Sequence, residues 1–107
     1  MKLIAIFTTA GNVDEARSIA RAVVERRLAA CAQITAIESF YRWQGTVQND
    51  EEYRVLIKTT DAQYASVEAT IRELHSYELP AIYSLPFERA FEPYAEWIAV
   101  ESSGPAP

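Results

Sequence analysis

Apolar and polar positions along the chain recur with periods that predict the first strand and the first helix. Residues 2–9 form a continuous apolar, β-branched run that ends at a Gly turn, which is typical of a buried central strand. Residues 13–28 then carry apolar side chains at helical spacing with charged residues between them. Asn12 followed by Glu15 is a capping-box pattern. We therefore expect a helix that begins after Asn12 and ends near Leu28.

The next segment predicts a long β-hairpin. Residues 31–43 are rich in Ile, Thr, Phe, Tyr and Trp, which favour strands, and Gln44-Gly45 supplies a turn. The chain resumes through residues 46–51 and continues as a strand over residues 52–59. Two strands this close in sequence are expected to pair in antiparallel fashion.

The last third of the chain predicts two more helices and one strand. Residues 60–63 match a second capping box, and the apolar face of the helix that follows is Tyr64, Val67, Ile71 and Leu74. Residues 81–85 read as a short fourth strand, and Pro93 suits the first turn of a brief third helix. Residues 102–107 are polar and rich in Gly and Pro, so we expect a flexible tail.

The order of these elements is β-α-β-β-α-β with a terminal helix. This order is typical of the ferredoxin-like α+β sandwich, a four-stranded antiparallel sheet with two helices on one face. A chain of 107 residues has room for one domain, which we place at residues 1–101, with the tail at 102–107.

The hairpin is too long for one small subunit. Thirteen residues of strand span about 40 Å, and the distal part carries large aromatic side chains. The apolar alternation also changes phase between Ala36 and Ile37, which indicates either a β-bulge or an arm that is apolar on both sides. An uncovered edge of this kind invites aggregation, so we expect burial by further copies of the chain in an oligomer, with a solvated arm as the alternative. The expected interface residues are Phe40, Tyr41, Trp43 and Tyr53.

Composition and charge exclude several classes of partner. The net charge is −5 and the basic residues are scattered, which disfavours nucleic acid and anionic membranes. The single cysteine cannot form an intrachain disulfide, as is common in a reducing compartment. The apolar N-terminal run is too short to span a bilayer and no signal-peptide cleavage pattern follows it. A cytoplasmic protein is the expectation.

Six collinear blocks resemble a known family. The blocks are 29–34 (AACAQI), 39–45 (SFYRWQG), 52–53 (EY), 58–60 (KTT), 75–80 (HSYELP) and 94–98 (YAEWI). They look like the signature blocks of the CutA divalent-cation-tolerance proteins, and the resemblance covers residues 2–99. It implies a ferredoxin-like trimer with long hairpins around a three-fold axis, a role in tolerance to divalent cations, and copper binding in some members. The trimer is similar to that of the PII signalling proteins, which bind small effectors between subunits.

Two departures from the family pattern bear on metal binding. The usual His-Pro-Tyr reads His75-Ser76-Tyr77 here, and the extra ligands linked with copper in some members fall on Phe7 and Leu74. The remaining candidate ligands for copper or another divalent metal are Cys31 and His75. A closed zinc site needs about four N or S ligands, so a metal site would need carboxylates or more than one subunit. The alternatives are a small core residue for Cys31 and a helix-end imidazole for His75.

The hairpin also offers a cleft for a small anionic ligand. Arg54 and Lys58 share one face of a strand, with aromatic residues nearby. The alternative is a solvated face on which these cations pair with Glu38 or Glu52. The candidate cleft residues are His75, Tyr77, Lys58, Arg54, Tyr41, Trp43 and Glu52.

No catalytic motif accompanies these residues, so we do not expect an enzyme. Three functions stay open: metal binding in metal-ion homeostasis, a PII-like sensor of a small anion, and a structural trimer without a ligand.

Overall fold

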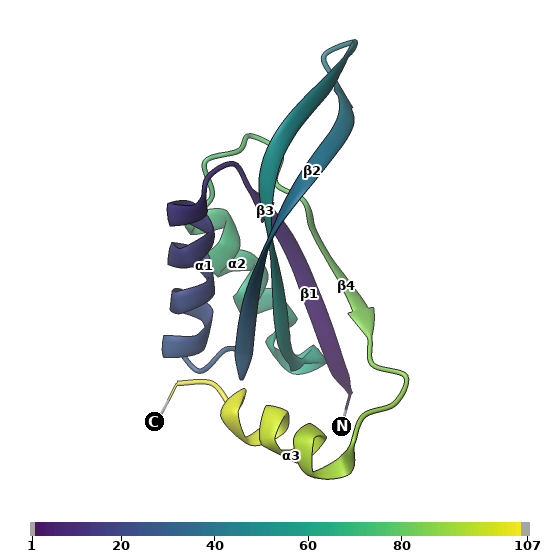
Figure 1. Ribbon diagram of the computed structural model, residues 1–107. Coiled ribbons are helices and arrows are strands. Elements are labelled where there is room, and N and C mark those ends of the chain that lie inside the picture. The colour runs from purple at the N-terminus through teal and green to yellow at the C-terminus, as the bar shows by residue number, and fades with distance from the viewer. Residues whose placement is uncertain (1, 106–107) are drawn as a thin grey trace.

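The computed structural model describes residues 2–105 and confirms the ferredoxin-like α+β arrangement (Figure 1). One four-stranded antiparallel sheet has the strand order β2-β3-β1-β4, so the first strand is central. The elements are β1 (Leu3–Ala10), α1 (Val13–Glu25), β2 (Cys31–Trp43), β3 (Thr46–Thr60), a 3-10 turn at Asp61–Gln63, α2 (Tyr64–Leu74), β4 (Ile82–Pro86) and α3 (Glu92–Glu101).

The core lies between one face of the sheet and the helices α1 and α2, which both cover that face (Figure 1). Burial alternates along β1, as expected for a strand that faces the core on one side only. The fully buried aliphatic residues are Ile4, Ile6, Ile19, Val23, Val55, Ile57, Val67 and Ile71.

The opposite side of the sheet is called the open face here. Because paired residues share a face, the alternation in β1 and the strand registers define its members. The open-face residues are Ala5, Phe7, Thr9, Cys31, Gln33, Thr35, Arg54, Leu56, Lys58, Tyr83 and Leu85.

Helix α1 ends three residues earlier than expected, at Glu25, because a Schellman motif closes it. The N–H of Leu28 donates to the carbonyl oxygen of Val23, and the N–H of Arg27 to that of Val24. Arg27 occupies the left-handed position of this motif, with φ of 60°. Sequence periodicity did not show this stop, because the residue at that position is normally Gly.

The hairpin forms as predicted and extends beyond the rest of the sheet (Figure 1). Gln44 and Gly45 both have positive φ, as a two-residue type I′ turn requires. The register runs without interruption from Cys31–Lys58 to Trp43–Thr46, so the predicted bulge is absent over these pairs. β1 pairs with β3 only as far as Tyr53, which leaves residues 37–52 as a two-stranded arm. The arm carries apolar side chains on both sides.

The capping box predicted at residues 60–63 is wrong. Thr60 is the last residue of β3, where it pairs with Leu3 and is buried, and its side chain makes no capping hydrogen bond. Asp61 instead donates its N–H to the carbonyl oxygen of Lys2, and a 3-10 turn leads into α2.

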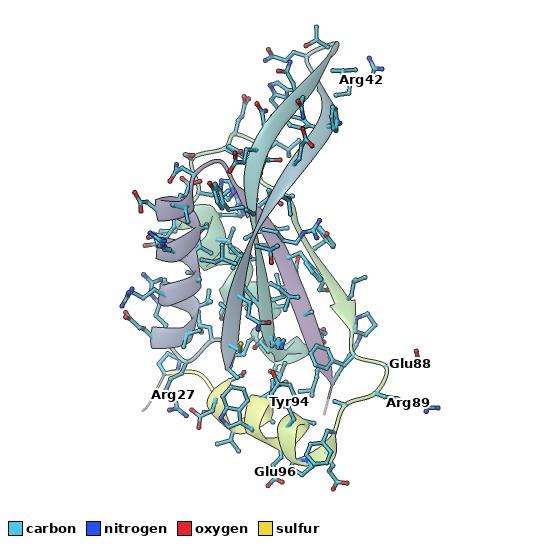
Figure 2. All side chains as sticks on the ribbon, viewed as in Figure 1. Arg27, Arg42, Glu88, Arg89, Tyr94 and Glu96 are labelled. Atoms are coloured by element: carbon cyan, nitrogen blue, oxygen red, sulfur yellow. The ribbon has the colours of Figure 1, made fainter. Side chains whose placement is uncertain are left out.

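The first residues of the expected tail contact Arg27, which follows the end of α1. Ser102 is buried, and the Arg27 side chain donates to the carbonyl oxygen of Gly104 at 3.2 Å and to the hydroxyl of Ser103 at 3.0 Å. Figure 2 shows Arg27 beside this C-terminal segment. Residue 1 of the predicted domain and residues 106 and 107 of the tail lie outside the described residues, and the boundary at 101 stays a prediction.

Candidate functional site

A polar network at the base of the hairpin brings three of the predicted cleft residues together. The Tyr77 hydroxyl donates to Glu52 Oε2 at 2.7 Å, and Glu52 is 7% exposed although it is an acid. Gly11 makes this contact possible, because a Cβ at position 11 would lie 2.9 Å from the Tyr77 hydroxyl oxygen. His75 is the third member, through its contact with the Tyr77 backbone.

Both ring nitrogens of His75 are already used within the chain. Nε2 lies 2.7 Å from the carbonyl oxygen of Thr9, and Nδ1 accepts the N–H of Tyr77 at 3.0 Å. The neutral imidazole with its proton on Nε2 satisfies both contacts, and this tautomer is assigned from the hydrogen bonds. The side chain is 1% exposed. His75 therefore has no free lone pair to offer a metal in this conformation.

Glu15 of α1 joins the same network. Asn12 caps the helix as predicted, since its side chain accepts the N–H of Glu15 at 2.8 Å. The Glu15 carboxylate does not return to Asn12; its Oε1 accepts the N–H of Ser76 at 3.0 Å. Its Oε2 is buried, has no hydrogen-bond partner among residues 2–105, and lies 3.7 Å from His75 Nδ1. Three separate segments of the chain thus meet at residues 75–77.

Three tyrosines at the hairpin donate their hydroxyls to three consecutive acids of β3. The pairs are Tyr41 with Asp50, Tyr53 with Glu51, and Tyr77 with Glu52. The hydrogen bond to Asp50 and then burial raise the pKa of Tyr41 to about 12. Burial and then the bond to Glu52 raise the pKa of Tyr77 further still.

We expect these tyrosines to make the protein sensitive to alkaline pH. A phenol whose pKa is raised from about 10 in the unfolded chain stabilises the fold below pH 10, and this contribution is lost as the pH rises. For Tyr41 the loss spans pH 10 to about 12. Spectrophotometric titration of phenolate is expected to show one late-titrating tyrosine fewer in Tyr41→Phe and one fewer in Tyr77→Phe, but no change in their number in Tyr83→Phe. If Tyr41→Phe and Tyr77→Phe each kept as many late-titrating tyrosines as the unaltered protein, this assignment would be contradicted.

Cys31 and Lys58 lie at the other end of the sheet. They are direct partners in the β2–β3 register, four residues along β3 from Arg54 and so about 13 Å from it. Lys58 Nζ donates to the Tyr94 hydroxyl at 3.0 Å, and Figure 2 shows Tyr94 on α3 below the sheet. The two candidate metal ligands, Cys31 and His75, are therefore not brought together within one chain. Among residues 2–105 no three His, Cys, Asp or Glu side chains are grouped so as to hold a metal ion.

The remaining predicted residues are divided between the two sides of the arm. Tyr41 and Trp43 continue the open face and are 39% and 37% exposed. Phe40 lies on the opposite side and is 69% exposed, and Tyr53 packs partly against its own core. Arg54 is exposed and forms no ion pair among residues 2–105, which removes the expected alternative of pairing with Glu38 or Glu52.

Sequence reasoning missed Glu15, Gly11, Thr9 and Tyr94 as parts of these sites. Glu15 carried a signal, but the signal indicated only a helix start. Gly11 indicated a turn, and Thr9 contributes only its backbone oxygen, which no side-chain pattern reports.

Relatives of known name match nearly the whole chain. The sequence profile of the family described as "CutA1 divalent ion tolerance protein" matches residues 4–101. The "Divalent-cation tolerance protein CutA" of Archaeoglobus fulgidus is 36% identical over 93 residues, which is 87% of this chain and 91% of the relative. The "Divalent-cation tolerance protein CutA" of Thermus thermophilus is 38% identical over 94 residues, which is 87% of this chain and 91% of the relative. "Protein CutA" of Mus musculus is 39% identical over 108 residues, and this chain spans 61% of its length.

Solved structures agree in fold. The Archaeoglobus fulgidus CutA structure, described as a periplasmic divalent cation tolerance protein, superposes with a TM-score of 0.91 at 33% identity, over 94% of this chain and 98% of that one. The Thermus thermophilus structure superposes with a TM-score of 0.90 at 36% identity, over 94% of this chain and 98% of that one. No helix among residues 2–105 combines the length and apolarity needed to cross a membrane. With the profile match over most of its length, the chain belongs to the CutA1 divalent ion tolerance protein family.

Proposed function

We propose that the protein is a cytoplasmic homotrimer that contributes to divalent-cation tolerance by binding a ligand at the seams between its copies. It acts by binding and not by catalysis. The observation that carries this proposal is the open face, which α1 and α2 leave uncovered and which continues into the projecting arm.

The exposed area supports association. The chain exposes 6794 Å², whereas a compact protein of 12.0 kDa is expected to expose roughly 6,000 Å². An excess of this kind is expected for a chain with a projecting arm that further copies would cover.

The chemistry of the open face supports the same conclusion. Phe7 stacks on Tyr83 with ring centroids 5.2 Å apart, and Tyr83 and Leu85 are 48% and 54% exposed. Tyr41 and Trp43 extend this apolar surface along the arm. Exposed contiguous apolar surface on one side of a sheet marks an interaction site.

A divalent metal is the ligand that the family name favours, and copper is the metal that we propose to test first. One chain groups no set of ligands among residues 2–105, so the site requires donors from at least two copies. Cys31 is the more available candidate, because it lies half-buried on the open face, whereas both nitrogens of His75 are engaged.

Calorimetric titration of Cu(I) and Cu(II) into the assembled protein tests this site. We expect stoichiometric binding that Cys31→Ala abolishes and that Cys31→Ser weakens. Binding is expected to survive Tyr77→Phe, which removes one hydroxyl from the hairpin base without touching Cys31. Full-affinity copper binding by Cys31→Ala would exclude the thiol, and no binding by the unaltered protein would exclude copper as the ligand.

A second candidate ligand is a small anion. Neither Arg54 nor Lys58 has a carboxylate partner among residues 2–105. Arg54 is exposed on the open face, whereas Lys58 is half-buried and donates to the Tyr94 hydroxyl, so Arg54 is the more available cation. A ligand that binds the folded state raises the melting temperature with concentration. A thermal-shift series with nucleotides and dicarboxylates is expected to show this rise, and Arg54→Gln is expected to remove it. An equal rise in Arg54→Gln would contradict the anion site.

A further inference from the structure

The contact between Ser76 and Glu15 joins the first turn of α1 to the loop at the hairpin base. The two residues are 61 positions apart in sequence, and the Glu15 side chain is only 12% exposed. The donor is the backbone N–H of residue 76. A proline at this position has no N–H and cannot form the bond. The contact therefore depends on a residue other than proline between His75 and Tyr77.

We propose that Glu15 is a positioning residue, which holds residues 75–77 through the Ser76 N–H so that Tyr77 stays bonded to Glu52. The inference goes beyond the proposed function, because it concerns the hairpin base, where Tyr77 and Glu52 meet, and not the copper or anion site. Its test needs no ligand, so its failure would leave the copper and anion experiments unaffected.

The positions on either side of the contact are fixed, which makes the bond an effective constraint. The backbone N–H of Glu15 donates to Asn12 Oδ1 at 2.8 Å, which fixes the start of the Glu15 side chain. His75 is held to the end of β1 by the carbonyl oxygen of Thr9. A hydrogen bond to a carboxylate is roughly twice as strong as one between neutral groups. The Ser76 bond thus removes the remaining freedom of the loop from which the Tyr77 ring extends.

One side of the Tyr77 ring is confined by neighbouring residues, while the residue as a whole is 36% exposed. Its hydroxyl oxygen would lie 2.9 Å from a Cβ at position 11, so only Gly11 permits the ring to reach Glu52 along this path. Its ring also packs against the His75 ring at 4.7 Å between centroids. A small displacement of residue 76 is therefore expected to break the Tyr77–Glu52 bond.

The chain offers two matched pairs of variants. Ser76→Pro removes the donor, and His75 already has φ −84° and ψ 138°, the extended conformation that a residue before proline prefers. Ser76→Ala keeps the N–H and is its control. Glu15→Ala removes the acceptor, and Glu15→Gln keeps an acceptor oxygen as its control.

NMR of the assembled protein measures the Tyr77 hydroxyl proton and the exchange of backbone amides at the hairpin base. We expect Ser76→Pro and Glu15→Ala to lose the slowly exchanging hydroxyl proton and to speed amide exchange around Glu52 by roughly tenfold or more. Exchange at Ile57 in the core is the internal reference and is expected to change much less. Ser76→Ala and Glu15→Gln are expected to keep the hydroxyl proton. In the double variant Glu15→Ala/Ser76→Pro, amide exchange around Glu52 is expected to be no faster than in either single variant.

Several outcomes would overturn the proposal. A Tyr77 hydroxyl proton that persists in Ser76→Pro and Glu15→Ala would show that the contact does not position Tyr77. Equal acceleration at Glu52 and Ile57 would indicate a general loss of stability, and additive effects in the double variant would show two unrelated contacts. If Ser76→Pro does not fold, the proposal is tested by Glu15→Ala and Glu15→Gln alone. A Tyr77 hydroxyl proton that is equally retained in both variants would then contradict it.

Discussion

Replacing Leu85 by Glu is expected to convert the assembled protein into single chains. Leu85 lies on the open face of β4, opposite Ala5, and is 54% exposed in the isolated chain. A Glu at this position is solvated in a free chain, so the fold itself is expected to change by no more than about 0.5 kcal/mol. In the proposed assembly the same carboxylate is expected to be buried without a partner, which costs several kcal/mol. We expect the dissociation constant to rise by more than about a hundredfold, measured by sedimentation velocity.

Val24 provides the matched control for Leu85. It is an exposed apolar residue, 40% exposed, but it lies on α1 and away from the open face. Val24→Glu introduces the same charge and is expected to leave the assembly unchanged. Assembly of Leu85→Glu at the affinity of the unaltered protein would contradict an interface through the open face, and so would equal dissociation of both variants.

Replacing His75 by Ala is expected to destabilise the fold by about 2–4 kcal/mol. The imidazole is 1% exposed, so its removal leaves a cavity. It also leaves the carbonyl oxygen of Thr9 and the N–H of Tyr77 without their partners. Urea unfolding at one fixed protein concentration measures the loss, because the stability of an assembly depends on concentration.

Two further variants show whether the loss comes from the ring contacts. Glu78→Ala changes an exposed residue of the same loop and is expected to cost less than about 0.5 kcal/mol. His75→Gln keeps a donor and an acceptor and is expected to recover part of the loss. His75→Ala with unaltered stability would contradict a structural role. The stability measurement must accompany any metal titration of this variant, since an unfolded chain also fails to bind.

The elements of the fold were predictable because they follow local patterns. The continuous apolar run of β1, the helical spacing of Ile19 and Val23, and the turn at Gln44-Gly45 each specify an element from neighbouring residues. The errors arose where tertiary contacts override a local pattern. Thr60 stays in the sheet instead of capping α2, because it pairs with Leu3.

The candidate site was predictable only in part. Tyr77, His75 and Glu52 were expected near one another and do meet. The bond from Ser76 to Glu15 spans 61 positions and uses a backbone donor, so no spacing rule can find it. The distance between Cys31 and His75 likewise depends on the strand register, which places Cys31 beside Lys58 and His75 beside Thr9.

All of the functional proposals require that copies of the chain cover the open face. Sedimentation equilibrium of the unaltered protein at micromolar concentration measures this most directly. Three chains of 12.0 kDa each are expected to sediment as one species. A stable species with the mass of one 12.0 kDa chain would contradict the account, because the open face and the arm would then remain exposed to solvent.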